Sequence, residues 1–264
     1  MRILALVDRP VPVLCRTPRE LLIIGVAAAT AISSVREHGL RDPGNAVAFA
    51  AVAAGFAARF FAMRVIATAV AVAAAGLHVA YAWKSGGHPR DLLAIAYFLC
   101  ATLVLGGRAL VTTFDDAPSR ANFWRELARR DRRRLALLVH GVALTVAMLY
   151  YVRYQLVAAG QPVPPWITAG LVGGAAVCVL LLLGRGLAVL LAVLGGLPLA
   201  VVTLAHAPLA WEVATGAYVP MTVSATVRVA PHLLVGAGLA AALTVAAAAP
   251  WAWRLVRLQN GKSQ

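Results

Sequence analysis

Histidine is the residue type in this sequence with the clearest capacity for chemistry. His78, His206 and His232 each lie near one end of a long apolar segment, and the distribution of basic residues predicts that all three ends lie on the outer side of a membrane. Imidazoles at one depth can bind copper or zinc, and two of them can hold a haem iron. No two of the three are three or four residues apart. Two interpretations therefore stay open: a metal or haem site, and ordinary solvated side chains at helix ends.

Other chemically active patterns are missing from the sequence. There is no HExxH, GxSxG or HxxxH motif, no paired-acid motif and no glycine-rich phosphate loop. Asp115 and Asp116 are adjacent and lie among arginines, which favours helix capping and charge balance. The three cysteines have no CxxC spacing and are interpreted as apolar packing residues. The sequence therefore favours a protein that is not an enzyme, and it leaves any cofactor unknown.

Glycine and proline interrupt one apolar segment near its middle, at Gly195, Gly196 and Pro198. Proline lacks an amide hydrogen and its ring clashes with the preceding helical turn, so we expect a kink or break there. Exposed carbonyls at such a break can bind a transported substrate, whereas a kink can also simply improve packing. In the preceding segment, Gly170 and Gly174 predict a close contact between helices.

The segment from Thr112 to Arg134 is strongly basic, with seven arginines against four acidic residues. We expect a helix that starts near Asp116 and Pro118, lies on the inner membrane surface and continues into the next apolar segment. Its arginines can bind anionic lipid head groups; the alternative is an acidic protein partner or a phosphorylated ligand. Nucleic acid is not expected. The candidate contact residues are Arg125, Arg129, Arg130, Arg132, Arg133 and Arg134.

The histidines, glycines and arginines described above must be positioned by helices that lie in a lipid bilayer. Of the 264 residues, 61% are hydrophobic and only 13% are charged, whereas charged residues make up about 25% of a typical soluble domain. The mean hydropathy is +0.81. We therefore predict one all-α transmembrane bundle over residues 1–264, located in the inner (plasma) membrane with many passes.

Apolar runs between charged residues predict eight spans. With both termini in the cytoplasm, 18 of the 24 lysines and arginines lie inside and six outside, as the positive-inside rule requires. Residues 112–134 then form a cytoplasmic connection and residues 207–230 an outer loop. The predicted spans are Leu21 to Val35, Ala46 to Ala58, Val65 to Trp83, Leu92 to Gly107, Leu135 to Val152, Trp166 to Leu183, Leu187 to His206 and His232 to Trp253.

The second of these spans is the least certain, because its apolar run has only 13 residues. We expect Arg59 to snorkel to the cytoplasmic surface, so that Phe60, Phe61 and Met63 lengthen the run to about 18 residues. The alternative is an interfacial segment. The amino terminus would then lie outside, and the charge count would change to 16 inside and eight outside.

Three functional hypotheses follow from these features. The leading one is a structural or accessory subunit of a membrane assembly, with the lipid bilayer, including anionic lipids, and other membrane proteins as partners. The second is a small-solute or lipid transporter that uses a broken seventh helix. The third is an electron-transfer protein that binds metal or haem through the outer histidines.

Overall fold

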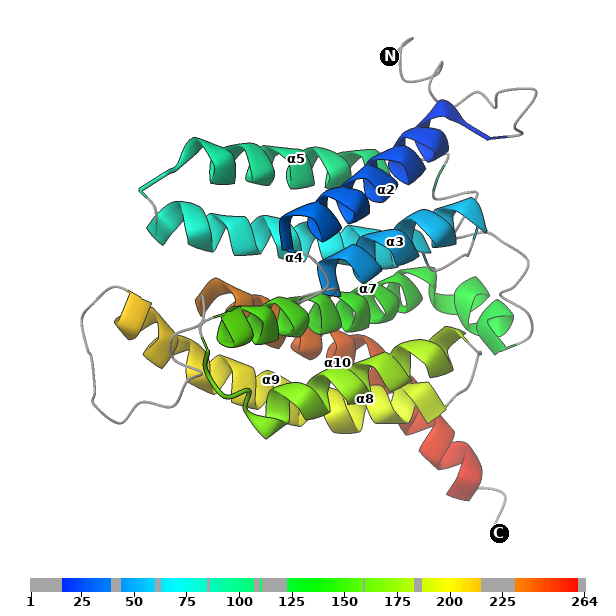
Figure 1. Cartoon of the computed structure of the whole chain (residues 1–264). Helices are drawn as coiled ribbons and strands as arrows, with labels where there is room; N and C mark the ends of the chain where they lie inside the picture. Colours follow the sequence, from blue (N-terminus) through cyan, green and yellow to red (C-terminus); the bar gives the residue numbers. More distant parts are fainter. Residues whose placement is uncertain are drawn as a thin grey trace. The chain divides into compact units, whose positions relative to one another are not determined.

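The computed structural model describes residues 16–38, 44–59, 63–84, 86–106, 110, 123–158, 160–182, 187–214 and 231–260. Eight α-helices account for nearly all of these residues, which confirms the predicted all-α fold (Figure 1). The helices are α2 (Pro18–His38), α3 (Gly44–Ala57), α4 (Met63–Lys84), α5 (Pro89–Leu105), α7 (Phe123–Ala158), α8 (Pro165–Leu182), α9 (Leu187–Ala214) and α10 (Pro231–Asn260).

Five of these helices are long and apolar enough to cross a membrane, by length and composition. They contain the stretches Pro18–Arg36, Met63–Trp83, Leu137–Val157, Leu187–Pro208 and Pro231–Arg254. The stretches Ala46–Ala57 and Pro165–Leu181 are apolar but shorter. Each of the eight predicted spans thus corresponds to one helix, and five helices satisfy the length and hydropathy expected of a span.

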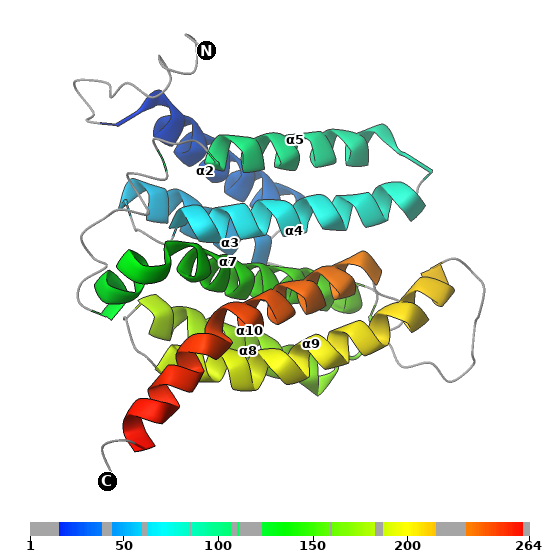
Figure 2. The same cartoon turned by 180° about the vertical axis from the view of Figure 1, so that it is seen from behind.

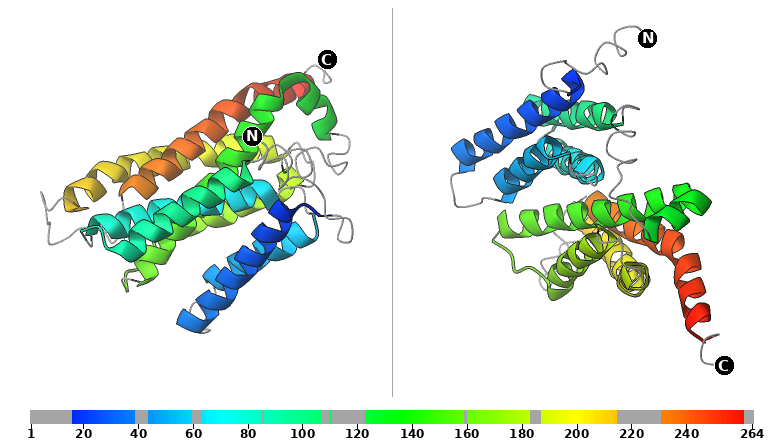
Figure 3. Two further views of the ribbon diagram at one scale, coloured as in Figure 1. Left: turned by 90° about the horizontal axis from the view of Figure 1, so that it is seen from above. Right: turned by 90° about the vertical axis from the view of Figure 1, so that its right-hand side faces the viewer.

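The chain divides into two compact units. The first consists of residues 1–68 and 101–119, and the second of residues 69–100 and 120–264, so the boundary passes through α4 and α5. In the first unit α2 and α3 pack side by side (Figure 3, left). They are antiparallel, because Arg16 at the start of α2 donates hydrogen bonds to the Phe56 and Ala57 carbonyls at the end of α3.

In the second unit, α10 packs along both α9 and α7, and α8 packs against α7 and α9 (Figure 2). Glycine permits a close approach of α7 and α10, because a Cβ on Gly141 of α7 would lie 3.1 Å from the Ala240 carbonyl oxygen of α10. A buried apolar cluster joins all four helices at one end of this bundle. It consists of Leu138, Val142, Val177, Leu181, Ala188, Val189, Ala192, Ala247, Ala248 and Trp251.

The end of α9 differs from the sequence-based expectation, whereas the course of α7 agrees with it. The helix α9 runs on to Ala214, so the first part of the predicted outer loop 207–230 is helical. The helix α7 begins at Phe123 and continues without interruption to Ala158, which agrees with a helix that enters the fifth span. Its predicted start near Asp116 and Pro118 lies outside the described residues.

The expected lengthening of the second span was wrong. The helix α3 ends at Ala57, and Arg59 lies in a turn with a φ of 51°, a left-handed conformation that stops the helix. Its guanidinium forms an ion pair with Glu20, with 3.2 Å between Nη2 and Oε2. The side chain is therefore paired with Glu20 of α2. Met63 is the first residue of α4, and Phe60 and Phe61 lie outside the described residues.

Of the kink or break expected in the seventh span, a break is not present, and a kink stays a prediction. The helix α9 continues through Gly195, Gly196 and Pro198. The fixed φ of proline is itself helical, so a single proline removes one amide donor, here the one that would reach the Leu194 carbonyl, and the helix can continue beyond it. A second proline, Pro208, lies further along the same helix.

Candidate functional site

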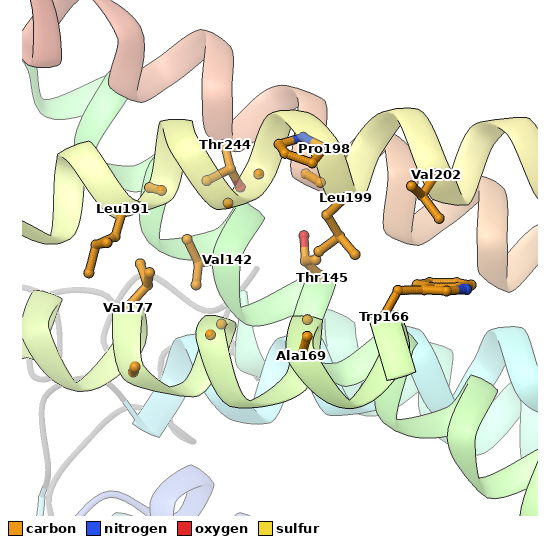
Figure 4. A pocket seen from close by; sticks show the side chains of 18 residues that line it. Val142, Thr145, Trp166, Ala169, Val177, Leu191, Pro198, Leu199, Val202 and Thr244 are labelled. Atoms are coloured by element: carbon orange, nitrogen blue, oxygen red, sulfur yellow. The ribbon is translucent and has the colours of Figure 1, made fainter. Parts of the chain in front are cut away.

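A groove of about 400 Å³ lies between α8 and α9, with α7 and α10 behind it (Figure 4). This volume is within the range of small-molecule sites, which is about 300–1,000 Å³. All its lining residues belong to the second unit. They are Val142 and Thr145 from α7; Trp166, Ala169, Gly170, Gly173, Gly174, Ala176 and Val177 from α8; Leu191, Ala192, Gly195, Gly196, Pro198, Leu199 and Val202 from α9; and Ala241 and Thr244 from α10.

Glycines on α8 form one wall of the groove. A Cβ on Gly170 would lie 2.9 Å from Leu149 Cδ1 of α7 and 3.1 Å from Leu199 Cδ1 of α9. A Cβ on Gly174 would lie 2.5 Å from Val146 of α7. These distances confirm the predicted close helix contact. Gly173, in contrast, has no atom within 4 Å of the Cβ position and borders open space.

The opposite wall contains the glycine-proline sequence of α9. Gly195 has open space at its Cβ position, whereas a Cβ on Gly196 would lie 2.9 Å from Val245 Cγ2 of α10. Pro198 also lines the groove. The predicted helix-contact glycines of α8 and the glycine-proline sequence of α9 therefore line the same groove, because the two helices are antiparallel neighbours.

Two threonines provide the polar atoms on the inner side of the groove, and both are satisfied within their own helices. The Thr145 hydroxyl donates to the Gly141 carbonyl, and the Thr244 hydroxyl donates to the Ala240 carbonyl, each with an oxygen–oxygen distance of 2.8 Å. Their hydrogens are therefore already used. This part of the groove presents almost entirely hydrocarbon to a ligand.

At one end of the groove, Trp166 of α8 lies against His206 of α9, with ring centres 5.6 Å apart. The indole nitrogen of Trp166 is at the end of the ring that points away from the other labelled side chains (Figure 4). His206 Nδ1 is 2.7 Å from the Val202 carbonyl oxygen. This end, called here the mouth, is the polar end of an otherwise apolar groove.

The composition of the lining residues suits an apolar molecule. It contains only valine, threonine, tryptophan, alanine, glycine, leucine and proline. Covalent or acid–base catalysis needs an activated nucleophile or a titratable group within reach of the substrate. The lining residues offer neither, and the titratable group described at the mouth is His206.

The three histidines proposed as metal ligands make separate contacts. His78 Nδ1 lies 3.2 Å from the Asp91 carboxylate of α5, His206 contacts Val202 and Trp166, and His232 Nε2 bonds to the Gly76 carbonyl of α4. Within the described ranges, no three His, Cys, Asp or Glu side chains are grouped as metal ligands. Metal or haem binding by these histidines therefore stays a prediction.

For most of the arginines predicted to contact lipid or a partner, the structure describes the backbone but not the side chain. Arg125, Arg129, Arg130, Arg132 and Arg133 lie on the first turns of α7, and their side chains are not among those described. Arg134 is half-buried on the same helix. The binding of these arginines to lipid or to a partner remains a prediction.

Sequence reasoning overlooked a polar cluster at the start of α2. Glu20 is almost fully buried, with 1% of its surface exposed, and its carboxylate forms an ion pair with the Arg59 guanidinium. The Thr17 hydroxyl accepts from the Glu20 amide and the Glu20 carboxylate accepts from the Thr17 amide, which is a capping box. Thr17 and Glu20 are three residues apart with Pro18 between them, and this pattern predicts a helix start.

Two arginines of the first unit bind the carboxyl end of α5. Arg19 donates to the Val104 carbonyl and Arg64 to the Leu105 carbonyl, both in the last turn of α5. Only 7% of each arginine is exposed. Cations are favourable at helix carboxyl ends, where carbonyls lack intrahelical partners. We infer that these ion-pair and hydrogen-bond contacts stabilise the packing of α2, α3 and the adjoining ends of α4 and α5.

No protein-family model, curated protein or solved structure matches this chain.

Proposed function

We propose that this chain is a multi-pass inner-membrane protein that binds the hydrocarbon part of a lipid-like molecule in the groove between α8 and α9. The groove carries this proposal, because it combines ligand-sized volume, an apolar interior and one polar end. The role is that of a binding or accessory component of a membrane assembly. The proposal stands beside the other two hypotheses, solute transport and electron transfer.

Access from the lipid phase supports a ligand of this class. On α8, Val172 and Val179 are exposed, at 66% and 52% of their surface. On α9, Leu194, Leu197 and Val201 are exposed, at 70%, 56% and 61%. Exposed apolar side chains on both helices that flank the groove are expected where a protein faces lipid. A hydrocarbon chain can then enter the groove sideways from the bilayer.

The placement in the membrane is part of the same proposal. The distribution of positive charge supports an inner-membrane protein with both termini in the cytoplasm, and the arginine-rich start of α7 would then lie near anionic head groups. Each basic residue near such a surface contributes about 1 kcal/mol to binding. A membrane-protein partner is a further proposed role for this segment.

Filling the groove tests the proposed function. Gly173→Leu adds a side chain where no atom lies within 4 Å and should occupy the groove without disturbing the helix contacts. Purified protein in lipid nanodiscs would be labelled with a photoactivatable alkyl-diazirine hydrocarbon, and the labelled residues would be mapped by mass spectrometry. We expect labelling concentrated on the groove residues of α8 and α9, reduced at least tenfold in the variant.

Gly25→Leu is the matched control, since Gly25 lies in α2 and also has open space at its Cβ position. It should leave groove labelling unchanged. Labelling spread evenly over exposed apolar residues, with no dependence on Gly173, would disprove binding in the groove.

A further inference from the structure

We infer that the ligand is a single-chain lipid with an uncharged hydroxyl-bearing head group, held with that head group at Trp166 and His206. This inference rests on the proposed function and adds the class and orientation of the ligand. Its evidence is the length of the groove, the hydrogen-bonding state of His206 and the absence of charge among the lining residues.

The length of the groove matches one leaflet of a bilayer. Along α8 the lining runs from Trp166 to Val177, and along α9 from Leu191 to Val202, so eleven helical steps separate the first and last residue in each case. At 1.5 Å per residue this is ~17 Å, close to half of a hydrocarbon core of about 30 Å. A single extended chain can therefore lie along the groove, with its tail near Val177 and Leu191.

Trp166 marks the head-group end of such a molecule. It is the second residue of α8, and tryptophan is enriched where membrane helices meet the polar interface. Its indole nitrogen is a donor only, and this nitrogen points away from the apolar interior (Figure 4). The mouth therefore offers one hydrogen-bond donor at the depth expected for a head group.

His206 is not itself one of the lining residues, but its ring centre lies 5.6 Å from that of Trp166 at the mouth, and it supplies an acceptor. A carbonyl oxygen only accepts, so His206 Nδ1, 2.7 Å from the Val202 carbonyl, must carry the hydrogen. In the neutral imidazole Nε2 is then an acceptor. A hydroxyl group both donates and accepts, so it can bond to Trp166 and His206 together, whereas an ionised phosphate has no hydrogen to give to Nε2.

The charge of the lining agrees with this choice. None of the side chains that line the groove is charged. Strong phosphate sites use arginine or lysine, whose hydrogen bonds to the anion are about twice as strong as neutral ones. An uncharged head group avoids the cost of placing an anion next to an apolar groove.

A competition experiment tests the head-group class. The photoactivatable alkyl-diazirine hydrocarbon would label the groove while two competitors with the same acyl chain are added, a monoacylglycerol and a lysophosphatidate. We expect the monoacylglycerol to displace the probe at a several-fold lower concentration. Equal or stronger displacement by lysophosphatidate would overturn the inference.

Variants at the mouth test its orientation. Trp166→Phe removes the donor and His206→Phe the acceptor, and each should raise the monoacylglycerol concentration needed for displacement about three- to tenfold, the usual range for one hydrogen bond. A plain alkane competitor should be unaffected. Trp253→Phe, at an exposed tryptophan on α10 outside the groove, is the control.

Different results would contradict the head-group inference and the proposed binding in the groove. If both mouth variants bind monoacylglycerol as the unchanged protein does, the head-group inference is wrong and groove binding survives. If probe labelling does not depend on Gly173 at all, the proposed function itself is wrong. Thermal unfolding of each variant confirms that the compared proteins are folded.

Discussion

At the scale of single residues, glycines decide where helices of the second unit meet. A Cβ on Gly141 would lie 3.1 Å from the Ala240 carbonyl oxygen and 3.3 Å from the Thr244 amide nitrogen, both backbone atoms of α10. Backbone cannot move aside as a side-chain end can, so α7 and α10 must separate to admit even one methyl group. Gly170 is different, since its neighbours are the flexible ends of Leu149 and Leu199.

The first prediction is that Gly141→Ala lowers the melting temperature of the purified protein. Overpacking of this kind typically costs about 1–3 kcal/mol. Gly25→Ala is the control, because it makes the same change in α2 with open space around it and should leave stability equal or slightly higher. Thermal unfolding in one detergent measures both. Equal melting temperatures for the two variants would contradict the close approach of α7 and α10.

At the scale of the helix, α9 shows how one element can tolerate two prolines. Pro198 and Pro208 each remove an amide donor, and both lie inside a continuous helix. Only Pro198 lines the groove. Replacing Pro208 therefore changes only the backbone hydrogen bonding of α9. Replacing Pro198 changes the hydrogen bonding and also the wall of the groove.

The second prediction compares Pro198→Ala with Pro208→Ala. Each change restores an amide donor and should raise the melting temperature, because proline inside a helix costs up to about 3 kcal/mol relative to alanine. Only Pro198→Ala should change labelling of the groove by the hydrocarbon probe, since it removes a ring from the wall. If Pro208→Ala alters groove labelling equally, the effect comes from the shape of the helix and not from the lining.

At the scale of the whole molecule, the crossing of the membrane by α3 decides where the amino terminus lies. This helix has 14 residues and a length of about 21 Å at 1.5 Å per residue, less than a hydrocarbon core of about 30 Å. If α3 crosses, both termini are cytoplasmic. If it lies at the interface, only the first segment changes sides.

The third prediction concerns topology. Reporter fusions after Leu110, Asn122 and Gln264 should report cytoplasm, and fusions at Gly86, Gln161 and Gly216 should report the outer side. An amino-terminal fusion should also report cytoplasm, because eight crossings place 18 basic residues inside and six outside, slightly more asymmetric than the 16 and eight of the alternative. An outer signal at Asn122 would overturn the orientation, whereas an outer signal at the amino terminus alone would show that α3 does not cross.

The sequence by itself determined the fold class and the approximate position of every helix among the described residues. Composition and apolar runs are enough for this, because a chain in lipid must satisfy its backbone within each helix. Local chemistry also predicted the small-residue contact at Gly170 and Gly174. The capping box of Thr17 and Glu20 was equally local and could have been recognised from its spacing.

The tertiary structure alone decided which residues share a site. Gly173 of α8 and Gly195 of α9 line one groove, and Trp166 meets His206, because antiparallel packing brings together residues that no sequence periodicity connects. It also separated His78, His206 and His232 into different contacts, since equal depth along three helices does not fix which way each side chain points. Depth in the membrane follows from hydropathy, but direction around each helix axis follows from packing against its neighbours.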